Sequence, residues 1–313
     1  MADAAKTLIL CVDIGGTSTK AGALHSCGEM RFVHSIPTKP DAESYGESLV
    51  ALIERIRHAA TRQGYQAEQL GVAVAGFLDP ERNHLLYNSN LSWLENFPLR
   101  SRLTERFPGL EIELEVDSNA AAIAEHRFGS GQGSKRFLCV TAGTGLGVGM
   151  IVEGAPLRFA YGCMGDVGHV IVLRNGPLCA CGGRGCAEIM VSAPVIGERY
   201  RQAAGIMEAR SLRDVIEAAE GGNTFAVSVL REAGEWLGIA LASMANMFFP
   251  DHIAVAGGLS AAGDLTLAPA EQVFRESVCE LVRSNIKFTQ ATLGSMATLV
   301  GAGWPFWERK ERL

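Results

Sequence analysis

The same short pattern opens both halves of this sequence. A buried apolar strand, a turn of glycine and threonine, and a second apolar strand are predicted over 12–24 and again over 140–152, at a constant spacing of 128 residues. Two apolar strands joined by so tight a turn are typical of an antiparallel hairpin. A pattern that recurs at the start of two segments of similar size indicates a duplicated unit. We therefore predict two related α/β lobes.

Strands and helices alternate along the rest of the chain. Further strands are predicted over 31–36, 72–75, 110–116 and 253–256, and helices over 45–61, 99–107, 119–128, 193–203, 223–248, 269–284 and 296–311. Such alternation favours α/β layers, with ligand-binding loops at the carboxyl ends of the strands. A chain of 313 residues is also long enough for two hydrophobic cores.

Composition excludes several other classes of protein. The net charge is −6 and no long run of lysine or arginine occurs, so neither a DNA nor an RNA partner is expected. The apolar stretch from Leu8 to Val12 is interrupted by Asp13, which makes it too short for an export signal. No segment approaches the roughly 18 apolar residues of a membrane span. We expect a cytoplasmic protein with no membrane partner.

The two glycine-rich turns carry the chemistry of phosphate loops. The first contains Asp13, Gly15, Gly16, Thr17 and Lys20. Glycines let backbone N–H groups approach an anion, Thr17 and Lys20 add donors, and Asp13 can help to hold a metal ion. For this first turn taken alone, a plain hairpin is an equally good interpretation. The second turn repeats the pattern with Thr141, Gly143, Thr144 and Gly145. Two such loops could hold a polyphosphate from both sides.

Asp117 stands where a predicted strand passes into a predicted helix. A carboxylate at such a strand end can accept a proton from an attacking hydroxyl group. The same position also suits a carboxylate that caps the helix. The two roles are compatible.

One loop has the spacing of a metal site. His169 is followed by Cys179, Cys181 and Cys186, with glycines between them. One imidazole and three thiolates suit tetrahedral zinc and leave no open position for water, so the predicted zinc is structural. The alternative, three unrelated thiols, fits poorly with a Cys-x-Cys pair in a glycine-rich loop. The other five cysteines are scattered, and small buried hydrophobic residues are the better interpretation for most of them.

These motifs together resemble the ROK family of bacterial repressors and sugar kinases. The resemblance runs from about residue 7 to the end, and the His-x9-Cys-x-Cys-Gly-x2-Gly-Cys-x-Glu motif is matched at every specified position. It implies an α/β actin-like ATPase fold with two ribonuclease-H-like lobes around a cleft. The small lobe would span 1–118, with the C-terminal helix, about 297–313, packing back on it. The large lobe would span 119–296 and carry the zinc loop.

The resemblance also assigns roles to residues. Asp117 matches the catalytic base of an ATP-dependent sugar kinase, with Mg²⁺ as a second cofactor. The nucleotide would lie on both phosphate loops, with the adenosine at Gly257 and Gly258. The sugar would contact Asp117 and four further residues, of which His169 also binds zinc: Asn90, Asp166, His169 and Glu188. We expect a small-molecule sugar as partner, and a homodimer or homotetramer.

Two positions depart from the family pattern. Val116 stands where asparagine is usual, and Asp166 stands where glutamate is usual. Both belong to the implied sugar pocket, and a site built to bind a hydroxyl group rejects analogues that lack it. Glucose is therefore the default substrate, and an amino sugar, an N-acylhexosamine or a cyclitol stays open.

Other functions within reach of these motifs are less well supported. A repressor of this family carries a DNA-binding domain ahead of the first loop, where only six residues precede the first strand here. A non-catalytic sugar-sensing protein would have no need of the intact Asp117 and Lys20. A plain ATPase would need neither the zinc loop nor Glu188.

Overall fold

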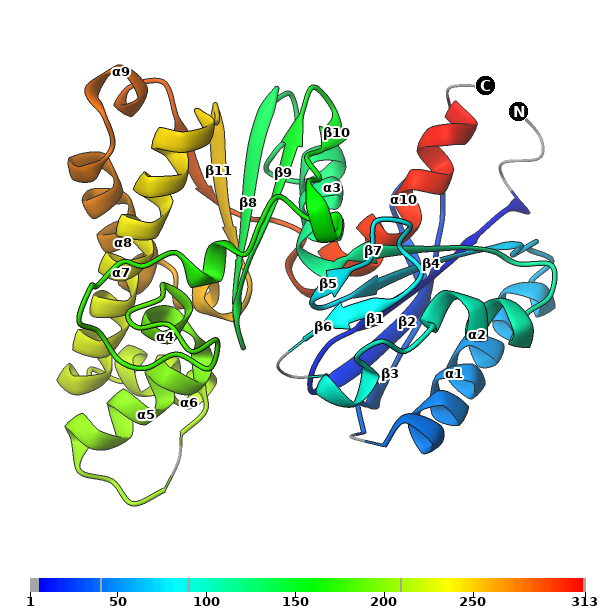
Figure 1. Cartoon of the computed structure of the whole chain (residues 1–313), viewed down its shortest axis with the longest axis horizontal. Helices are drawn as coiled ribbons and strands as arrows, with labels where there is room; N and C mark the ends of the chain where they lie inside the picture. The colour runs from blue at the N-terminus through cyan, green and yellow to red at the C-terminus, as the bar shows by residue number, and fades with distance from the viewer. Residues whose placement is uncertain (1–5, 40, 89–90, 209, 312–313) are drawn as a thin grey trace. The chain divides into compact units, whose positions relative to one another are not determined.

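The structure is a computed structural model that describes residues 6–39, 41–88, 91–208 and 210–311. The chain divides into two compact units of α/β structure (Figure 1). The first contains the described residues of 1–128, 156–165 and 295–313, and the second contains 129–155 and the described residues of 166–294. None of the described helices is long and apolar enough to cross a membrane.

A five-stranded sheet forms the centre of the first unit. Its order is β3 (Met30–Pro37), β2 (Ser18–Leu24), β1 (Ile9–Ile14), β4 (Gln69–Val74) and β7 (Glu111–Val116). The pairs β1–β2 and β2–β3 are antiparallel, whereas β1, β4 and β7 run parallel. A small hairpin, β5 (Phe77–Leu78) with β6 (Leu85–Tyr87), follows β4.

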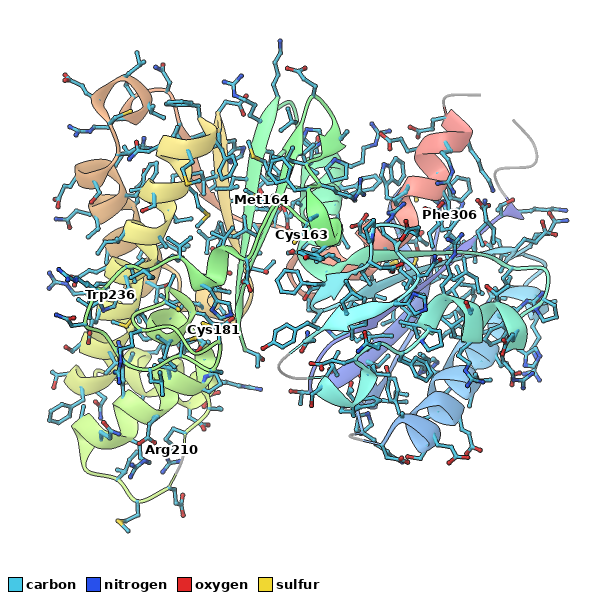
Figure 2. All side chains as sticks on the ribbon, in the orientation of Figure 1. Cys163, Met164, Cys181, Arg210, Trp236 and Phe306 are labelled. Carbon is cyan, nitrogen blue, oxygen red and sulfur yellow. The ribbon has the colours of Figure 1, made fainter. Side chains whose placement is uncertain are left out.

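Helices cover both faces of this sheet. Alternate residues of β1, such as Leu10 and Val12, lie in one core cluster with α1 (Ala42–Arg62) and α2 (Leu99–Arg106). The other face is covered by α10 (Ala297–Glu311), which packs on α3 (Asp117–Phe128) and on β1 and β4. Phe306 of α10 is fully buried there (Figure 2). The C-terminal helix thus completes the unit that the N-terminal strand begins.

The second unit repeats the strand order of the first. Its sheet runs β10 (Ala155–Pro156), β9 (Leu146–Val152), β8 (Arg136–Ala142), β11 (His252–Ala256) and β12 (Lys287–Gln290). As in the first sheet, an antiparallel hairpin, β8–β9, is followed by parallel strands. This common order agrees with the duplication that the repeated pattern predicted.

The spacing of 128 residues does not hold across the whole hairpin. In the first unit Ile14 pairs with Thr19, and in the second Ala142 pairs with Leu146. The second turn is therefore one residue shorter, and the strand pairing shifts by one position.

The helices of the second unit differ in places from the sequence prediction. They are α4 (Glu188–Val191), α5 (Ala193–Ala204), α6 (Leu212–Glu220), α7 (Thr224–Phe248), α8 (Asp264–Ser277) and α9 (Glu280–Arg283). The single helix predicted over 269–284 is wrong, because Val278 is extended and the Cys279 N–H donates to the side chain of Asn246 at 2.9 Å. The prediction also missed α6 and the edge strand β12.

Candidate functional site

The first glycine-rich turn lies between β1 and β2. The Gly15 N–H donates to the Ser18 carbonyl at 3.2 Å, and the Thr38 hydroxyl donates to the Gly15 carbonyl at 2.8 Å. Thr38 also lies 2.9 Å from the Thr19 hydroxyl, which contacts the Tyr45 hydroxyl of α1 at 2.6 Å. The turn is therefore held by side chains from β2, from the segment after β3 and from α1. The sequence prediction did not include Thr38 or Tyr45, because their part depends on the packing of α1.

Two carboxylates lie at the carboxyl edge of the first sheet. Asp13 is the penultimate residue of β1 and lies beside Lys20, its partner on β2, and Asp117 follows β7 directly. Burial raises the pKa of Asp13 to about 6, against the opposing effect of Lys20. Burial also raises the pKa of Asp117 to about 7, and the negative charge of Asp13 adds to this shift. A carboxylate whose pKa lies near neutrality is well suited to general-base catalysis.

Asp117 is also the first residue of α3. Its Oδ1 accepts a hydrogen bond from the Ser118 N–H at 2.7 Å. The carboxylate is therefore fixed at the positive end of the helix dipole while it stays half-buried. The Lys20 side chain is also held in place, because its Nζ donates to the carbonyl of Ser295, just before α10, at 3.3 Å.

The second glycine-rich turn lies between β8 and β9 and contacts Glu188. Gly143 N–H donates to the Gly145 carbonyl at 2.9 Å, and Glu188 Oε2 accepts from the Leu146 N–H at 2.9 Å. A Cβ on Gly145 would lie 2.6 Å from that same Oε2, so a side chain there would displace the Glu188 carboxylate. One carboxylate oxygen of Glu188 is thus already hydrogen-bonded to the turn. Thr144, at the tip, is exposed.

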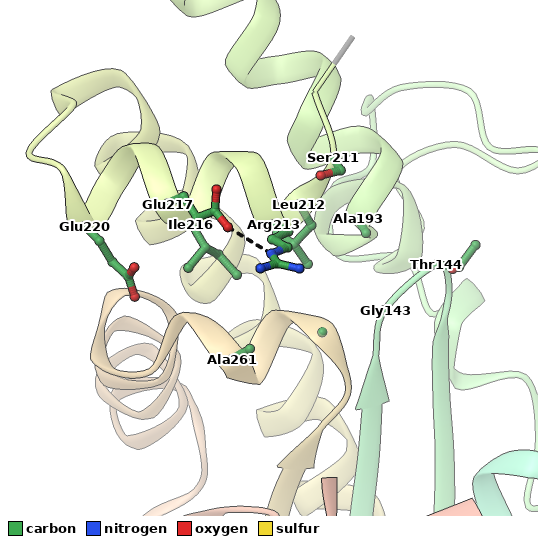
Figure 3. A pocket seen from close by; sticks show the side chains of 11 residues that line it. Gly143, Thr144, Ala193, Ser211, Leu212, Arg213, Ile216, Glu217, Glu220 and Ala261 are labelled. Carbon is green, nitrogen blue, oxygen red and sulfur yellow. Dashed lines mark hydrogen bonds and ion pairs between the residues drawn. The ribbon is translucent and has the colours of Figure 1, made fainter. Parts of the chain in front are cut away.

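A cavity of about 680 Å³ lies beside this turn within the second unit. Leu212, Ile216 and Ala261 give it an apolar lining, and Glu217 and Glu220 of α6 add carboxylates (Figure 3). Arg213 donates to Glu217 at 2.8 Å. The other lining residues are Gly143, Thr144, Ala193, Ser211 and Gly258. Gly258 thus lines a cavity that adjoins the second glycine-rich turn.

Gly257 has a different structural role from Gly258. Its φ is +87°, and a Cβ would lie 2.4 Å from the Ala142 carbonyl oxygen. It permits the close approach of β11 to the end of β8 and does not line the cavity. Helix α6 supplies five of the eleven lining residues, and the sequence prediction missed this helix. The signal was present, since Ser211 and Asp214 form a reciprocal capping box ahead of the helix.

The four predicted metal ligands are brought together in the second unit. The ligand atoms of His169, Cys179, Cys181 and Cys186 all lie within 4.8 Å of one another. Cys179 Sγ is 3.6 Å from His169 Nδ1, and Cys181 Sγ is 3.6 Å from Cys186 Sγ. Such separations suit ligands about 2.0–2.3 Å from one tetrahedral zinc ion. Cys181 lies on the long loop that precedes α4 (Figure 2).

The remaining predicted sugar residues fall in three places. Asp166 Oδ2 lies 3.5 Å from His169 Nε2, the ring nitrogen that faces away from the thiols. Burial and the charge of Glu188 raise the pKa of Asp166, while His169 lowers it. Val116 is 4% exposed and lies in the core cluster with Leu78 and Cys163. Asn90 lies outside the described residues.

Comparison with known proteins agrees with this fold. The model of the ROK family matches residues 9–308. A glucokinase from Streptomyces coelicolor is 32% identical over 94% of this chain and 96% of its own length. The crystal structure of a ROK family glucokinase from Streptomyces griseus, in complex with glucose and AMPPNP, is 33% identical with a TM-score of 0.86. It covers 95% of this chain and 98% of that chain.

Relatives with another function share the fold. A ROK family transcriptional regulator, a homologue of the E. coli MLC protein, has a TM-score of 0.85 at 24% identity. It is covered over 77% of its length and matches 95% of this chain.

A duplicated α/β unit with a glycine-rich turn in each half defines the actin-like class of proteins. Within that class, the family match over almost the whole chain is decisive: this chain belongs to the ROK family.

Proposed function

We propose that the chain is an ATP-dependent sugar kinase that transfers the γ-phosphate to a hydroxyl group of a hexose or hexose-like sugar. The observation that carries this proposal is Asp117, a half-buried carboxylate at a strand end whose pKa is raised to about 7. Such a group is poised to take a proton near neutral pH. The glucokinases among its relatives support the same activity.

In the proposed reaction Asp117 accepts the proton of the acceptor hydroxyl. The hydroxyl oxygen forms a bond to the γ-phosphorus, the bond from that phosphorus to the β,γ-bridging oxygen breaks, and ADP leaves. Lys20 and the turn before it bind phosphate oxygens, and so does Thr144. Positioning and electrostatic stabilisation supply most of the catalysis in this class of reaction.

The cavity beside Thr144 is the proposed site of the donor nucleoside. Its apolar lining suits a neutral base, and Glu217 and Glu220 can accept hydrogen bonds from amino or hydroxyl groups. Because Arg213 pairs with Glu217, the cavity keeps one net negative charge, which disfavours an extended polyphosphate chain. A nucleoside triphosphate is therefore favoured as donor over inorganic polyphosphate.

Two metal ions complete the proposal. Asp13 would hold Mg²⁺, which when bound neutralises charge on the transferring phosphoryl group. His169, Cys179, Cys181 and Cys186 would hold a structural zinc ion. With Nδ1 of His169 on the metal, Nε2 is free to act with Asp166 and the outer oxygen of Glu188 in binding sugar hydroxyls. These roles, and the expected homodimer or homotetramer, stay predictions.

A coupled assay of ADP release tests the proposal. Glucose, amino sugars, N-acylhexosamines and cyclitols are offered as acceptors, with ATP or polyphosphate as donor. We expect turnover that needs both a sugar and ATP. ATP hydrolysis that does not depend on a sugar would instead indicate a plain ATPase. Sugar binding without turnover would indicate a sensing protein.

A further inference from the structure

A ten-residue strap from the second half of the sequence belongs to the first unit. Residues 156–165 form this strap, and its bend is the short 3-10 turn η3 (Ala160–Gly162). The Phe159 N–H donates to the Cys163 carbonyl at 2.8 Å and closes the bend. Tyr161 has φ 63° and ψ 22°, a left-handed conformation that is unfavourable for a residue with a side chain. Such strain is typically kept where a side chain has a function.

A buried carboxylate anchors the strap beside Asp117. Glu115 is 3% exposed and accepts hydrogen bonds from Arg158 of the strap and from Asn119 Nδ2, the latter at 2.9 Å. Asn119 Nδ2 also donates to the Gly162 carbonyl at 2.8 Å. A buried charge is tolerated only when it is well paired, so these contacts hold the bend firmly. Glu115 and Asn119 stand two residues before and two after Asp117.

Three aromatic rings meet at the bend. The Tyr161 ring contacts the edge of Phe77 at 6.3 Å between centroids, and Phe77 stacks with Tyr87 at 6.3 Å. Tyr161 is 55% exposed and Tyr87 is 43% exposed. We call Phe77, Tyr87 and Tyr161 the aromatic platform. Aromatic pairs at such separations stabilise each other and leave their outer faces open to a ligand.

The aromatic platform adjoins the catalytic end of β7. A Cβ on Gly162 would lie 3.5 Å from Val116 and 3.5 Å from Leu78. Gly162 follows Tyr161, Val116 precedes Asp117, and Leu78 follows Phe77. The segments that carry the aromatic platform therefore pack against the segment that carries Asp117. Val116 is apolar where it meets Gly162. The aromatic platform therefore lies on a segment that adjoins the one carrying Asp117, the proposed general base.

We propose that the aromatic platform is an acceptor subsite for a ring attached to the sugar that is phosphorylated. The preferred acceptor is then a glycoside, with either a second pyranose or an aryl group on the platform. Both substituents offer an apolar face that packs against aromatic rings. This inference rests on the proposed kinase activity and extends it to the class of acceptor.

The test compares acceptors that differ only in the attached group. The probes are glucose, methyl glucoside, phenyl glucoside and a glucose disaccharide, in both anomeric forms. For the natural chain we expect kcat/KM to be about three- to tenfold higher for an acceptor with a second ring than for methyl glucoside. Preference for phenyl over disaccharide, or the reverse, identifies which ring is bound. Equal values for methyl and ring-bearing glucosides would overturn the proposal.

Two variants and one control locate the effect. Tyr161→Asn removes a ring and keeps a residue that tolerates the left-handed conformation, and Tyr87→Ser removes the other exposed ring. Both should lower the ratio of kcat/KM for ring-bearing over methyl glucoside towards one, with the KM for ATP unaltered. Phe225→Ser, at a 51% exposed phenylalanine of α7, should leave all values as they are.

Two other results have different meanings. If the ratio persists in both platform variants while light scattering shows a smaller particle, the platform is a contact between copies of the chain and the proposal fails. If no sugar is phosphorylated at all, the kinase activity itself is wrong.

Discussion

Asp117 has to lose its proton before it can act as a base, and its raised pKa determines where that happens. Below a pH of about 7 the carboxylate becomes protonated, so kcat/KM should fall as the pH is lowered through that value. Asp13→Asn removes the negative charge that helps to raise this pKa, and should move the acid limb of the profile to lower pH. A limb that stays in place would show that the titrating group is not Asp117.

Substitution of the same residue separates activity from stability. Asp117→Asn should lower kcat by about 10²–10⁴-fold while sugar and ATP still bind. A raised folded pKa means that the native state holds its proton more tightly than the unfolded chain, so stability declines as the pH rises from about 4 towards 7. The variant lacks this penalty. Its free energy of unfolding at pH 8 should therefore be higher, by an amount on the order of 1 kcal/mol, and its thermal midpoint should rise accordingly. Undiminished turnover would remove Asp117 from catalysis.

At the scale of elements, the loop before α4 would link the proposed structural metal to the proposed sugar site. Cys179 and Cys181 lie on a loop whose exposed residues include Ile171 and Leu178. Four ligands around one ion would order such a loop. His169 would then couple the metal to Asp166, because one ring nitrogen lies beside Cys179 and the other beside Asp166.

Removal of one thiol tests this coupling. Elemental analysis should find about one zinc ion per natural chain. Cys181→Ser should lose most of the metal and raise the KM for sugar more than the KM for ATP. Cys27→Ser, which alters an exposed cysteine of the first unit, serves as control and should keep the zinc. Full activity in metal-free protein would contradict a role for the ion.

At the scale of the whole molecule, the two ends of the chain build one unit. Helix α10 packs so closely on α3 that a Cβ on Gly301 would lie 1.7 Å from the Ala120 carbonyl oxygen. Ala73, Ala120 and Ala302 form a small cluster at the same contact. Because α3 begins with Asp117, the position of the base depends on a helix at the far end of the sequence.

Glycine-to-alanine exchanges measure that dependence. Gly301→Ala should lower the free energy of unfolding by about 1–3 kcal/mol and reduce kcat, because α10 has to move away from α3. Gly46→Ala, in the second turn of α1 with no atom within 4 Å of the added methyl group, should instead stabilise the protein by about 0.5–1 kcal/mol. Denaturant titration of both variants gives the comparison. Equal effects would show that the contact between α10 and α3 is loose.

Much of this protein could be predicted from short stretches of sequence. The glycine turns, the junction at Asp117 and the cysteine loop depend on residues close together in the chain, so their spacing carries the information. The family resemblance rested on the same stretches, and the family match confirms it. The repeated hairpin predicted a duplicated α/β unit for the same reason, and the two sheets have the same strand order.

Other features of the protein depend on contacts between residues far apart in the sequence, and only the tertiary structure reveals them. The strap at 156–165 joins the first unit because Glu115 and Asn119 bind it, and no local pattern marks that pairing. Part of the cavity wall comes from α6, which meets the turn at Gly143 only after folding. Val116 lies in the core although its place in the motif suggested a pocket residue. Local spacing predicts which groups a chain contains, but long-range packing determines which of them meet.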